Sequence, residues 1–430
     1  MSIAAVVEQL SIPNVAAGRA KRDPVESFRW DEAEWAIVRT VRSRSGSEVE
    51  SRIHAVHRPK LGDLAADFDA AWLRSFEPPK VPGTIDVRFA DLFAGCGAMS
   101  VGVIEACRAL GKTAHAMYAA DMNGKALGVY KENLTPRRSH SGLIEQNLDS
   151  PIGSALSERE RSLKKRVGRV DLVVGGPPCQ GHSDLNNHTR RRDPKNALYL
   201  RMVRFAEVFE PSWMIIENVR GVLHDENNVL SVAQDALERL DYTVEVIVLS
   251  GESLGVPQRR QRVFLLASKE KLPPLEKDLD RYRQPSRSFA WACDDLIRTR
   301  AHPIMDATGT PSPLNKHRID YLFDNDCYDL PNSERPKCHR DKEHSYNSVY
   351  GRMRWNAPAP TITTGFGSMG QGRYVHPKQR RTITPHEAAR LQFIPDFFSF
   401  GDVNRAAIAE MIGNAVPPKM AYVATLHLLR

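Results

Sequence analysis

The chain has 430 residues, of which 41% are hydrophobic and 26% are charged, and its formal net charge is +8. This composition is typical of a globular protein with a sizeable core, and the lack of a long apolar run excludes a membrane-spanning helix. The positive charge favours an anionic partner, nucleic acid above all, although a basic enzyme without such a partner is equally compatible with it.

Cysteine usage and the N-terminus indicate the cellular setting. The six cysteines form no CxxC pair, and the N-terminus lacks the basic start of a secretory signal, so we expect reduced thiols in a cytoplasmic protein. The group most similar to a metal site is irregularly spaced, and we expect no metal there. Its members are Cys327, Cys338, His339 and His344.

Residues 1–84 are expected to form an N-terminal extension of unknown role. Residues 16–27 are predicted to be a loop, and residues 30–45, WDEAEWAIVRTVRSRS, are predicted to form either a short helix or a pair of strands. The proline-rich stretch PPKVPG, residues 78–83, is typical of a linker.

Residues 85–269 alternate short apolar runs with amphipathic stretches, which predicts an α/β domain with a mostly parallel sheet. The apolar runs begin with VRFADLF, HAMYAAD and SGLIEQN and continue with VDLVVGG, SWMIIENV and YTVEVIVL. RVFLLAS, residues 262–268, follows after a short loop and is predicted to be an antiparallel final strand.

The alternation stops near residue 270, and residues 270–376 are expected to form a smaller, loop-rich domain. Residues 377–430 are expected to return to the first domain. Residues 384–392 predict a helix with Thr384 as N-cap, Pro385 at the first helical position and Glu387 three residues after the cap. Residues 417–429 predict a final helix.

A strand, a glycine-rich turn and a helix are predicted over DLFAGCGAMSVG, residues 91–102. Gly95 and Gly97 would let the backbone approach a ligand, and Asp121, which ends the next strand, could bind ribose hydroxyls. There is no phosphate-binding GKT or GKS, which disfavours ATP. These residues suggest a nucleoside-containing cofactor, but glycines that only turn the chain explain them equally well.

Cys179 follows two glycines and two prolines in VVGGPPCQGHS, residues 173–183. The prolines stiffen the turn, and the cysteine would lie at the carboxyl end of a central strand, where open α/β sheets bind ligands. A buried structural cysteine is the alternative reading.

Two further strands place polar groups toward the same edge. SWMIIENV ends in Glu217 and Asn218, where a glutamate in a pocket could keep its proton at neutral pH, although capping of the next turn would also explain it. Gln258, Arg260 and Arg262 alternate in GVPQRRQRVF, so an extended chain would put them on one face, with a solvated basic edge as the alternative.

Taken together, these motifs resemble the bacterial-type DNA (cytosine-5)-methyltransferases, because six of them follow the family's order between residues 88 and 418. They are DLFAGCGAMSVG, GGPPCQGHS, ENVRG, QRRQR, RTITPHEAARLQ and GNAVPP. The resemblance implies a Rossmann-like class I methyltransferase domain, a target-recognition domain over 270–376, and transfer of a methyl group from S-adenosylmethionine to carbon 5 of cytosine.

The resemblance also implies roles for individual residues. Catalysis would use Cys179 as nucleophile, Glu217 as proton donor to ring nitrogen 3, and Asn218, Arg260 and Arg262 as supporting groups. Cofactor binding would use Phe93, Gly95, Gly97, Asp121, Met122, Asn147, Pro177, Asn414 and Val416. DNA contacts would come from Gln180, Ser183, Arg190, Arg191, Arg192, Gln258, Thr361 and Thr363.

Three positions depart from the family pattern. Ala98 replaces a second glycine, Asn147 stands where an aspartate is common (with Asp149 two residues on), and His182 replaces an aromatic residue. The arginines at 190–192 would lie near phosphates, or form a solvated charge run.

The family implies that the target cytosine is flipped out of duplex DNA. We expect a monomer in the nucleoid region of the cytoplasm, with a cognate restriction endonuclease as a further partner. One alternative is a tRNA cytosine-5 methyltransferase, although the Cys-Phe-Thr tripeptide typical of that branch is missing. The other is an inactive DNA-binding relative, although Cys179 and Glu217 are retained. The target sequence and the base that removes the carbon 5 proton are not indicated.

Overall fold

The computed structural model describes most of the chain outside the first 22 residues. The described residues are 23–55, 58–59, 62–80, 85–178, 198–225, 228–298, 302–340 and 349–430. None of the helices within these segments has the length and apolar character needed to span a membrane.

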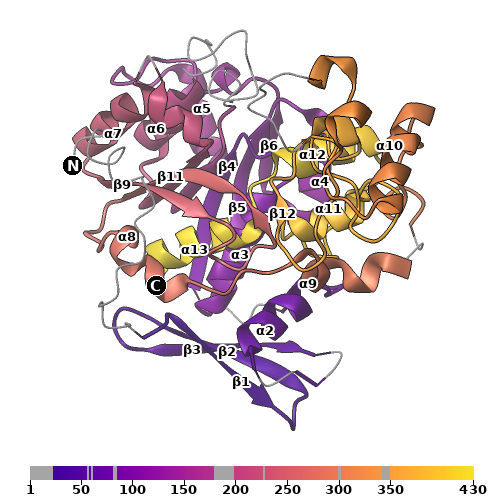
Figure 1. Cartoon of the computed structure of the whole chain (residues 1–430). Coiled ribbons are helices and arrows are strands. Elements are labelled where there is room, and N and C mark those ends of the chain that lie inside the picture. Colours follow the sequence, from indigo (N-terminus) through magenta and orange to yellow (C-terminus); the bar gives the residue numbers. More distant parts are fainter. Residues whose placement is uncertain are drawn as a thin grey trace.

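The centre of the molecule is a seven-stranded sheet in the order β6-β5-β4-β7-β8-β11-β9 (Figure 1). Its strands are β4 (Ile85–Leu92), β5 (Lys112–Asp121), β6 (Arg138–Ser141), β7 (Leu172–Gly175), β8 (Trp213–Asn218), β9 (Thr243–Ser250) and β11 (Gln261–Ser268). Neighbours from β6 to β8 are parallel, whereas β11 is antiparallel to both β8 and β9. The predicted mostly parallel sheet with an antiparallel final strand is confirmed, and this strand, β11, lies between β8 and β9.

One predicted strand is wrong. The run over residues 141–147 was expected to be extended, but β6 ends at Ser141 and residues Ile144–Gln146 form the 3-10 helix η1. Gly142, with φ of 151°, turns the chain between them. The apolar side chains of this run therefore belong to a turn and a short helix.

Alternating side chains of the strands pack on opposite faces of the sheet, as a period of two residues requires. In β7, Leu172 and Val174 belong to one core cluster and Val173 to the other. One face is covered by α3 (Ala98–Ala109) and α13 (Pro418–Leu429), and the other by α5 (Glu158–Val167), α6 (Tyr199–Phe209) and α7 (Val229–Arg239). Strands buried on both faces explain the continuous apolar runs in the sequence.

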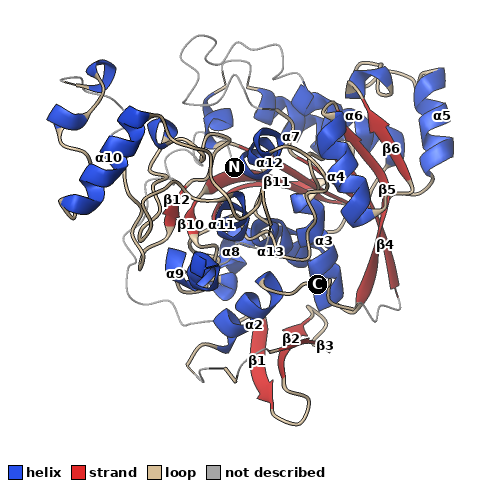
Figure 2. Cartoon of the chain, turned by 90° about the vertical axis from the view of Figure 1, so that its right-hand side faces the viewer, coloured by secondary structure: helices blue, strands red, loops and turns tan. Residues whose placement is uncertain are grey.

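Residues 23–80, which we call the N-terminal module, form a separate small sheet and one helix. Its strands, in the order β1-β2-β3, are β1 (Glu26–Asp31), β2 (Ala36–Arg42) and β3 (Glu48–His54), and its helix is α2 (Leu64–Leu73). Of the two structures predicted for residues 30–45, the strands are therefore the ones observed. Figures 1 and 2 show α2 between this sheet and the rest of the molecule.

The C-terminal half contains short elements joined by long loops (Figure 2). They are β10 (Gln258–Arg259), α8 (Leu275–Asp278), α9 (Phe289–Cys293), α10 (Pro313–Asp324), β12 (Ala359–Pro360), α11 (Pro385–Leu391) and α12 (Arg405–Asn414), with α4 (Gly124–Leu134) from the first half packed near α12. A small separate core contains Ile319, Leu322, Leu330, Met369 and Val375. Leu275 and Phe289 belong instead to the main core, so the chain leaves the main body well after residue 270.

The predicted capping of α11 is confirmed. Thr384 accepts a hydrogen bond from the backbone N–H of Glu387, whose carboxylate accepts one from the backbone N–H of Thr384, and Pro385 begins the helix. The predicted final helix corresponds to α13.

Candidate active site

The carboxyl ends of five parallel strands meet at one edge of the sheet, and the turn after β4 lies there. Phe93, Gly95 and Gly97 all have positive φ, at 58°, 53° and 95°. A Cβ on Gly97 would lie 2.5 Å from Leu134, so glycine is required there by space as well as by backbone conformation. Around Gly95, by contrast, a Cβ would meet nothing within 4 Å. The turn is thus packed underneath and open beside Gly95.

Asp121, at the end of β5, organises this turn. Its Oδ2 accepts a hydrogen bond from the Gly95 N–H at 2.7 Å, and its Oδ1 accepts one from the Asn123 N–H at 2.7 Å. Each carboxylate oxygen can accept a second hydrogen bond, so the group keeps capacity for a ligand hydroxyl.

Two apolar side chains near Asp121 are exposed beyond the strand ends. Met122 is 69% exposed after β5, and Leu143 is 51% exposed just after β6. The Gly142 N–H donates to the Asp121 carbonyl at 3.1 Å, which holds the two strand ends together. Exposed apolar groups beside a carboxylate and an open glycine suit the base and ribose of a nucleoside. The fit supports the expected class of cofactor.

A buried carboxyl group that the sequence did not single out lies below the glycine turn. Asp91 accepts a hydrogen bond from the Ser100 hydroxyl at 2.5 Å, and that hydroxyl lies 2.9 Å from the hydroxyl of Tyr130. Burial raises the pKa of Asp91 to about 7, against the opposing effect of the Ser100 hydrogen bond. The three side chains connect β4 with the first turn of α3 and with α4.

Asn147 has a partner within the protein. Its Nδ2 donates to the Tyr118 hydroxyl at 3.3 Å, while Asp149 accepts a hydrogen bond from the Ser157 hydroxyl at 2.6 Å. Asp149 thus binds Ser157, the N-cap of α5, whereas Asn147 contacts β5 through Tyr118.

The turn that carries the predicted nucleophile is described only as far as Pro178. Pro177 is buried, and Gly176 lies so close to the acid on β8 that a Cβ there would be 3.1 Å from Glu217 Oε2. Seven residues of interest lie beyond, outside the described part of the chain: Cys179, Gln180, His182, Ser183, Arg190, Arg191 and Arg192.

The buried Glu217 pairs with the partly buried Arg262 at this edge. Arg262 Nε lies 2.9 Å from Glu217 Oε1, and their side chains are 15% and 10% exposed. Glu217 is paired in register with Phe264, so Arg262 is its diagonal neighbour on the same face, within reach of a long side chain. Burial raises the pKa of Glu217, and the positive charges of Arg262 and Arg260 only partly oppose this.

Asn218 is buried beside Glu217, where it shapes the turn that follows. Its Oδ1 accepts a hydrogen bond from the Val219 N–H at 2.8 Å, just before the 3-10 helix η3 (Arg220–His224). The supporting role expected for Asn218 stays a prediction.

Arg260 and Gln258 point into the interior. Arg260 donates to the carbonyls of Ile362 at 2.9 Å and Gly413 at 3.3 Å. The exposed fraction of Gln258 is zero: its Nε2 donates to the Leu391 carbonyl at 2.9 Å, and its Oε1 accepts from the Ile362 N–H at 2.9 Å. This differs from the expected DNA contact, because the amide of Gln258 is enclosed by protein. Of the three alternating residues Gln258, Arg260 and Arg262, only Arg262 forms an ion pair with Glu217.

Gln392 completes this buried connection, and the sequence reasoning did not single it out. It accepts a hydrogen bond from Gln258 Nε2 at 2.6 Å and donates to the Ile412 carbonyl at 2.5 Å. It is the last residue of the quoted motif RTITPHEAARLQ, which was the available signal. Two amides thereby join QRRQR to Ile412, the residue before GNAVPP.

The threonines expected near the target base are held by protein groups. The Thr361 hydroxyl donates to the Arg259 carbonyl at 2.7 Å, and the Thr363 hydroxyl lies 2.9 Å from the Tyr374 hydroxyl. We call GNAVPP, residues 413–418, the closing motif. A Cβ on Gly413 would lie 2.4 Å from the Thr363 carbonyl carbon, so the chain at Thr363 packs directly on the closing motif. The next residue, Asn414, is exposed, and Val416 is buried.

Comparison with known proteins agrees with this arrangement. A family model described as "C-5 cytosine-specific DNA methylase" matches residues 87–429. The type II methyltransferase M1.BsuMI of Bacillus subtilis is 47% identical over 409 residues, covering 94% of this chain and 95% of that protein. The type II methyltransferase M.DdeI of Desulfomicrobium norvegicum is 29% identical, covering 77% and 86%.

A solved structure shows the same fold. It is a putative DNA modification methyltransferase encoded within a prophage of E. coli, with a TM-score of 0.51 and 22% identity. It covers 80% of this chain and 98% of its own. The class of fold is therefore shared with it.

Proposed function

Since the chain belongs to the C-5 cytosine-specific DNA methylases, we propose that it methylates carbon 5 of a cytosine flipped out of duplex DNA, through a covalent adduct with Cys179. The observation that carries the proposal is the ion pair of the buried Glu217 with Arg262, because the acid lies next to Gly176, three residues before Cys179. A raised pKa suits Glu217 to donate a proton near neutral pH.

The residues of the chain act in a defined order in this proposal. The Cys179 thiol loses its proton to solvent, and the thiolate forms a bond to carbon 6 while Glu217 protonates ring nitrogen 3. Carbon 5 thereby becomes nucleophilic. After methylation a water-derived base removes the carbon 5 proton, the bond to sulfur breaks, and the nitrogen 3 proton returns to Glu217. Arg262 orients the acid and the cytosine carbonyl oxygen.

The proposed methyl donor is S-adenosylmethionine, which supplies an electrophilic methyl group on a positively charged sulfur. Asp121 would accept hydrogen bonds from its ribose, and Met122 and Phe93 would contact its adenine. Gly95 would lie below its methionine part, where a side chain would intrude, with Pro177, Asn147, Asn414 and Val416 around it. Support comes from the open space at Gly95 and the exposed apolar surface of Met122.

The proposed substrate is duplex DNA, and the basic charge of the chain favours it. The chain at Thr363 packs on the closing motif, so Thr361 and Thr363 would lie between the target-recognition domain and the catalytic residues. Relatives named type II methyltransferases favour a role beside a restriction endonuclease that cuts the same sequence. We propose that the enzyme acts as a monomer.

Trapping with 5-fluorocytosine tests the proposal. The protein should form a covalent complex with duplex DNA containing 5-fluorocytosine at its target, only when S-adenosylmethionine is present. Cys179→Ser should abolish the complex, and Cys327→Ser, a matched thiol in the recognition segment, should retain it. The target is first found by expression in cells that lack cytosine methylation, followed by sequencing of methylated positions. Methyl transfer to tRNA alone, assayed in parallel, would refute a DNA substrate.

A further inference from the structure

The N-terminal module lies outside the family match, which begins at residue 87. The 94% match to the Bacillus subtilis relative necessarily extends into it. We propose that α2 of this module is a positioning element of the methyltransferase, and that Asp69 acts through Lys419 to fix the closing motif against the cofactor helix α3. The cofactor part of this inference rests on the proposed function.

The central contact is a buried ion pair. Lys419 Nζ donates to Asp69 Oδ1 at 2.8 Å, and the two side chains are 6% and 5% exposed. Lys419 lies in the first turn of α13 and directly follows GNAVPP, residues 413–418. A charge removed from water needs its partner, so the position of Lys419 depends on Asp69.

The start of α13 in turn packs on α3 without space to spare. A Cβ on Gly102 of α3 would lie 2.2 Å from the Pro418 carbonyl oxygen. The two helices therefore meet at a backbone contact, and a shift of Lys419 would change the distance between the closing motif and the glycine turn that begins α3.

Helix α2 also contacts α3 directly. Trp72 Nε1 of α2 donates to Glu105 Oε2 of α3 at 3.2 Å. Glu105 also pairs with Arg39 of β2 at 2.9 Å, and with Arg108 at 2.6 Å. The N-terminal module thus contacts α3 through a partly buried network of charges.

The two ends of α2 bind residues 287–295, near the start of the expected target-recognition domain. Asp63, the N-cap of α2, pairs with Arg287 at 2.6 Å. At the other end Arg74 donates to the Trp291 carbonyl at 2.7 Å and pairs with Asp295 at 3.2 Å. One ten-residue helix therefore connects the cofactor side of the molecule with its recognition side.

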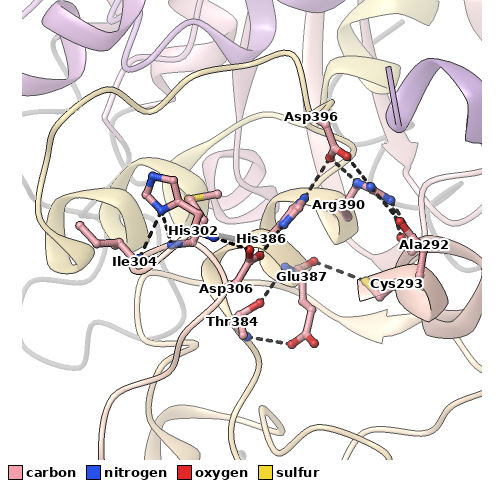
Figure 3. A network of polar contacts seen from close by, with 12 residues as sticks. Ala292, Cys293, His302, Ile304, Asp306, Thr384, His386, Glu387, Arg390 and Asp396 are labelled. Carbon is pink, nitrogen blue, oxygen red and sulfur yellow. Dashed lines mark hydrogen bonds and ion pairs between the residues drawn. The ribbon is translucent and has the colours of Figure 1, made fainter. Parts of the chain in front are cut away.

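The last turn of α2 also meets the polar network around α11. The Leu73 carbonyl accepts a hydrogen bond from the Asp396 N–H at 2.9 Å, and Asp396 pairs with Arg390 (Figure 3). Arg390 also donates to the Ala292 carbonyl at 3.0 Å. Helix α2 therefore contacts the same polar network that joins α11 to α9.

Equilibrium binding and kinetics of matched variants test the inference. The double variant Asp69→Leu/Lys419→Met removes both charges and keeps the apolar bulk, so no unpaired charge is left in the interior. We expect its Kd and KM for S-adenosylmethionine to rise about tenfold, with kcat and the KM for DNA within twofold of wild type. Glu50→Gln, which removes an exposed pair with Arg29 in the same module, should change none of these.

Hydrogen exchange gives a second readout that needs no cofactor. Peptides covering residues 411–420 should exchange faster in the double variant, whereas peptides of β9 should not. Asp69→Asn, which keeps the shape of the side chain, is measured in the same way and decides the question if the double variant does not fold. Unchanged exchange together with unchanged affinity would overturn the inference. A wild-type protein that binds no S-adenosylmethionine would refute the proposed cofactor, while hydrogen exchange would still decide the role of α2.

Discussion

Arg262 Nε lies 2.9 Å from Glu217 Oε1, and the two residues belong to the antiparallel strands β11 and β8, at the edge of the sheet where β7 also ends. The pair explains how a glutamate can be buried at this edge without losing a partner for its charge. Burial favours the protonated acid, whereas the guanidinium favours the carboxylate, and the net result is a raised pKa for Glu217.

Replacing this acid should affect chemistry more than binding. Glu217→Gln keeps the size of the side chain but cannot transfer a proton, so kcat should fall by roughly 100-fold or more, with the Kd for S-adenosylmethionine unchanged. In the wild type, kcat should fall as the pH rises through the pKa of Glu217, because the protonated acid is the active form. Glu252→Gln at the exposed pair with Arg259 is the matched control. A kcat for Glu217→Gln close to wild type would contradict the assignment.

Met122 offers a test of the cofactor site that is separate from stability. Because the side chain is 69% exposed, Met122→Ala should leave the unfolding midpoint nearly unchanged but weaken S-adenosylmethionine binding by roughly tenfold through lost apolar contact. Isothermal titration measures the affinity. Leu314→Ala, a 68% exposed position on α10, should bind as wild type does. Equal affinities for both variants would exclude Met122 from the site.

The buried amides should matter for stability. Gln258→Leu leaves the Ile362 N–H and the Leu391 carbonyl without their partner, which should lower the free energy of unfolding by about 1–3 kcal/mol. Urea denaturation measures the change. Gln261→Leu, three residues along the chain and exposed, should cost far less. An effect no larger than that of Gln261→Leu would show that Gln258 does not stabilise the interface.

His386 should make stability depend on pH above its unfolded pKa of about 6.5. Its ring lies between Asp306 at 2.7 Å and Asp396 at 3.1 Å (Figure 3). Burial opposes the charged ring, but hydrogen bonds to both carboxylates outweigh this, and the neighbouring Arg390 does not reverse it, so the pKa of His386 is raised.

The sign of this dependence follows from linkage. A raised folded-state pKa gives stability that is complete below the unfolded value of about 6.5 and is lost as the pH rises through the folded value. The free energy of unfolding should therefore fall with rising pH in this window, and His386→Gln should flatten the curve. Burial lowers the pKa of His376 to about 4, so that residue acts in the opposite direction, below pH 6.5. A variant that keeps the full slope above pH 6.5 would assign it to another group.

The sequence by itself determined the order of the motifs, the parallel sheet with its antiparallel strand, and the capped helix α11. These features depend on local patterns: apolar runs for strands buried on both faces, and a threonine followed by glutamate at a helix start. Even there, the strand expected over residues 141–147 was wrong, because β6 ends at Ser141 and Gly142 then turns the chain into a short 3-10 helix.

Only the tertiary structure decided which polar residues face the site. Gln258 and Arg262 have the same periodicity in the sequence, but Gln258 is enclosed by Gln392 and Ile362, more than 100 residues away, while Arg262 meets Glu217 on a neighbouring strand. The contact of Asp69 with Lys419 joins residues 350 positions apart. Local patterns cannot predict such partners, because burial of a polar group depends on which distant segment supplies its hydrogen bond or its opposite charge.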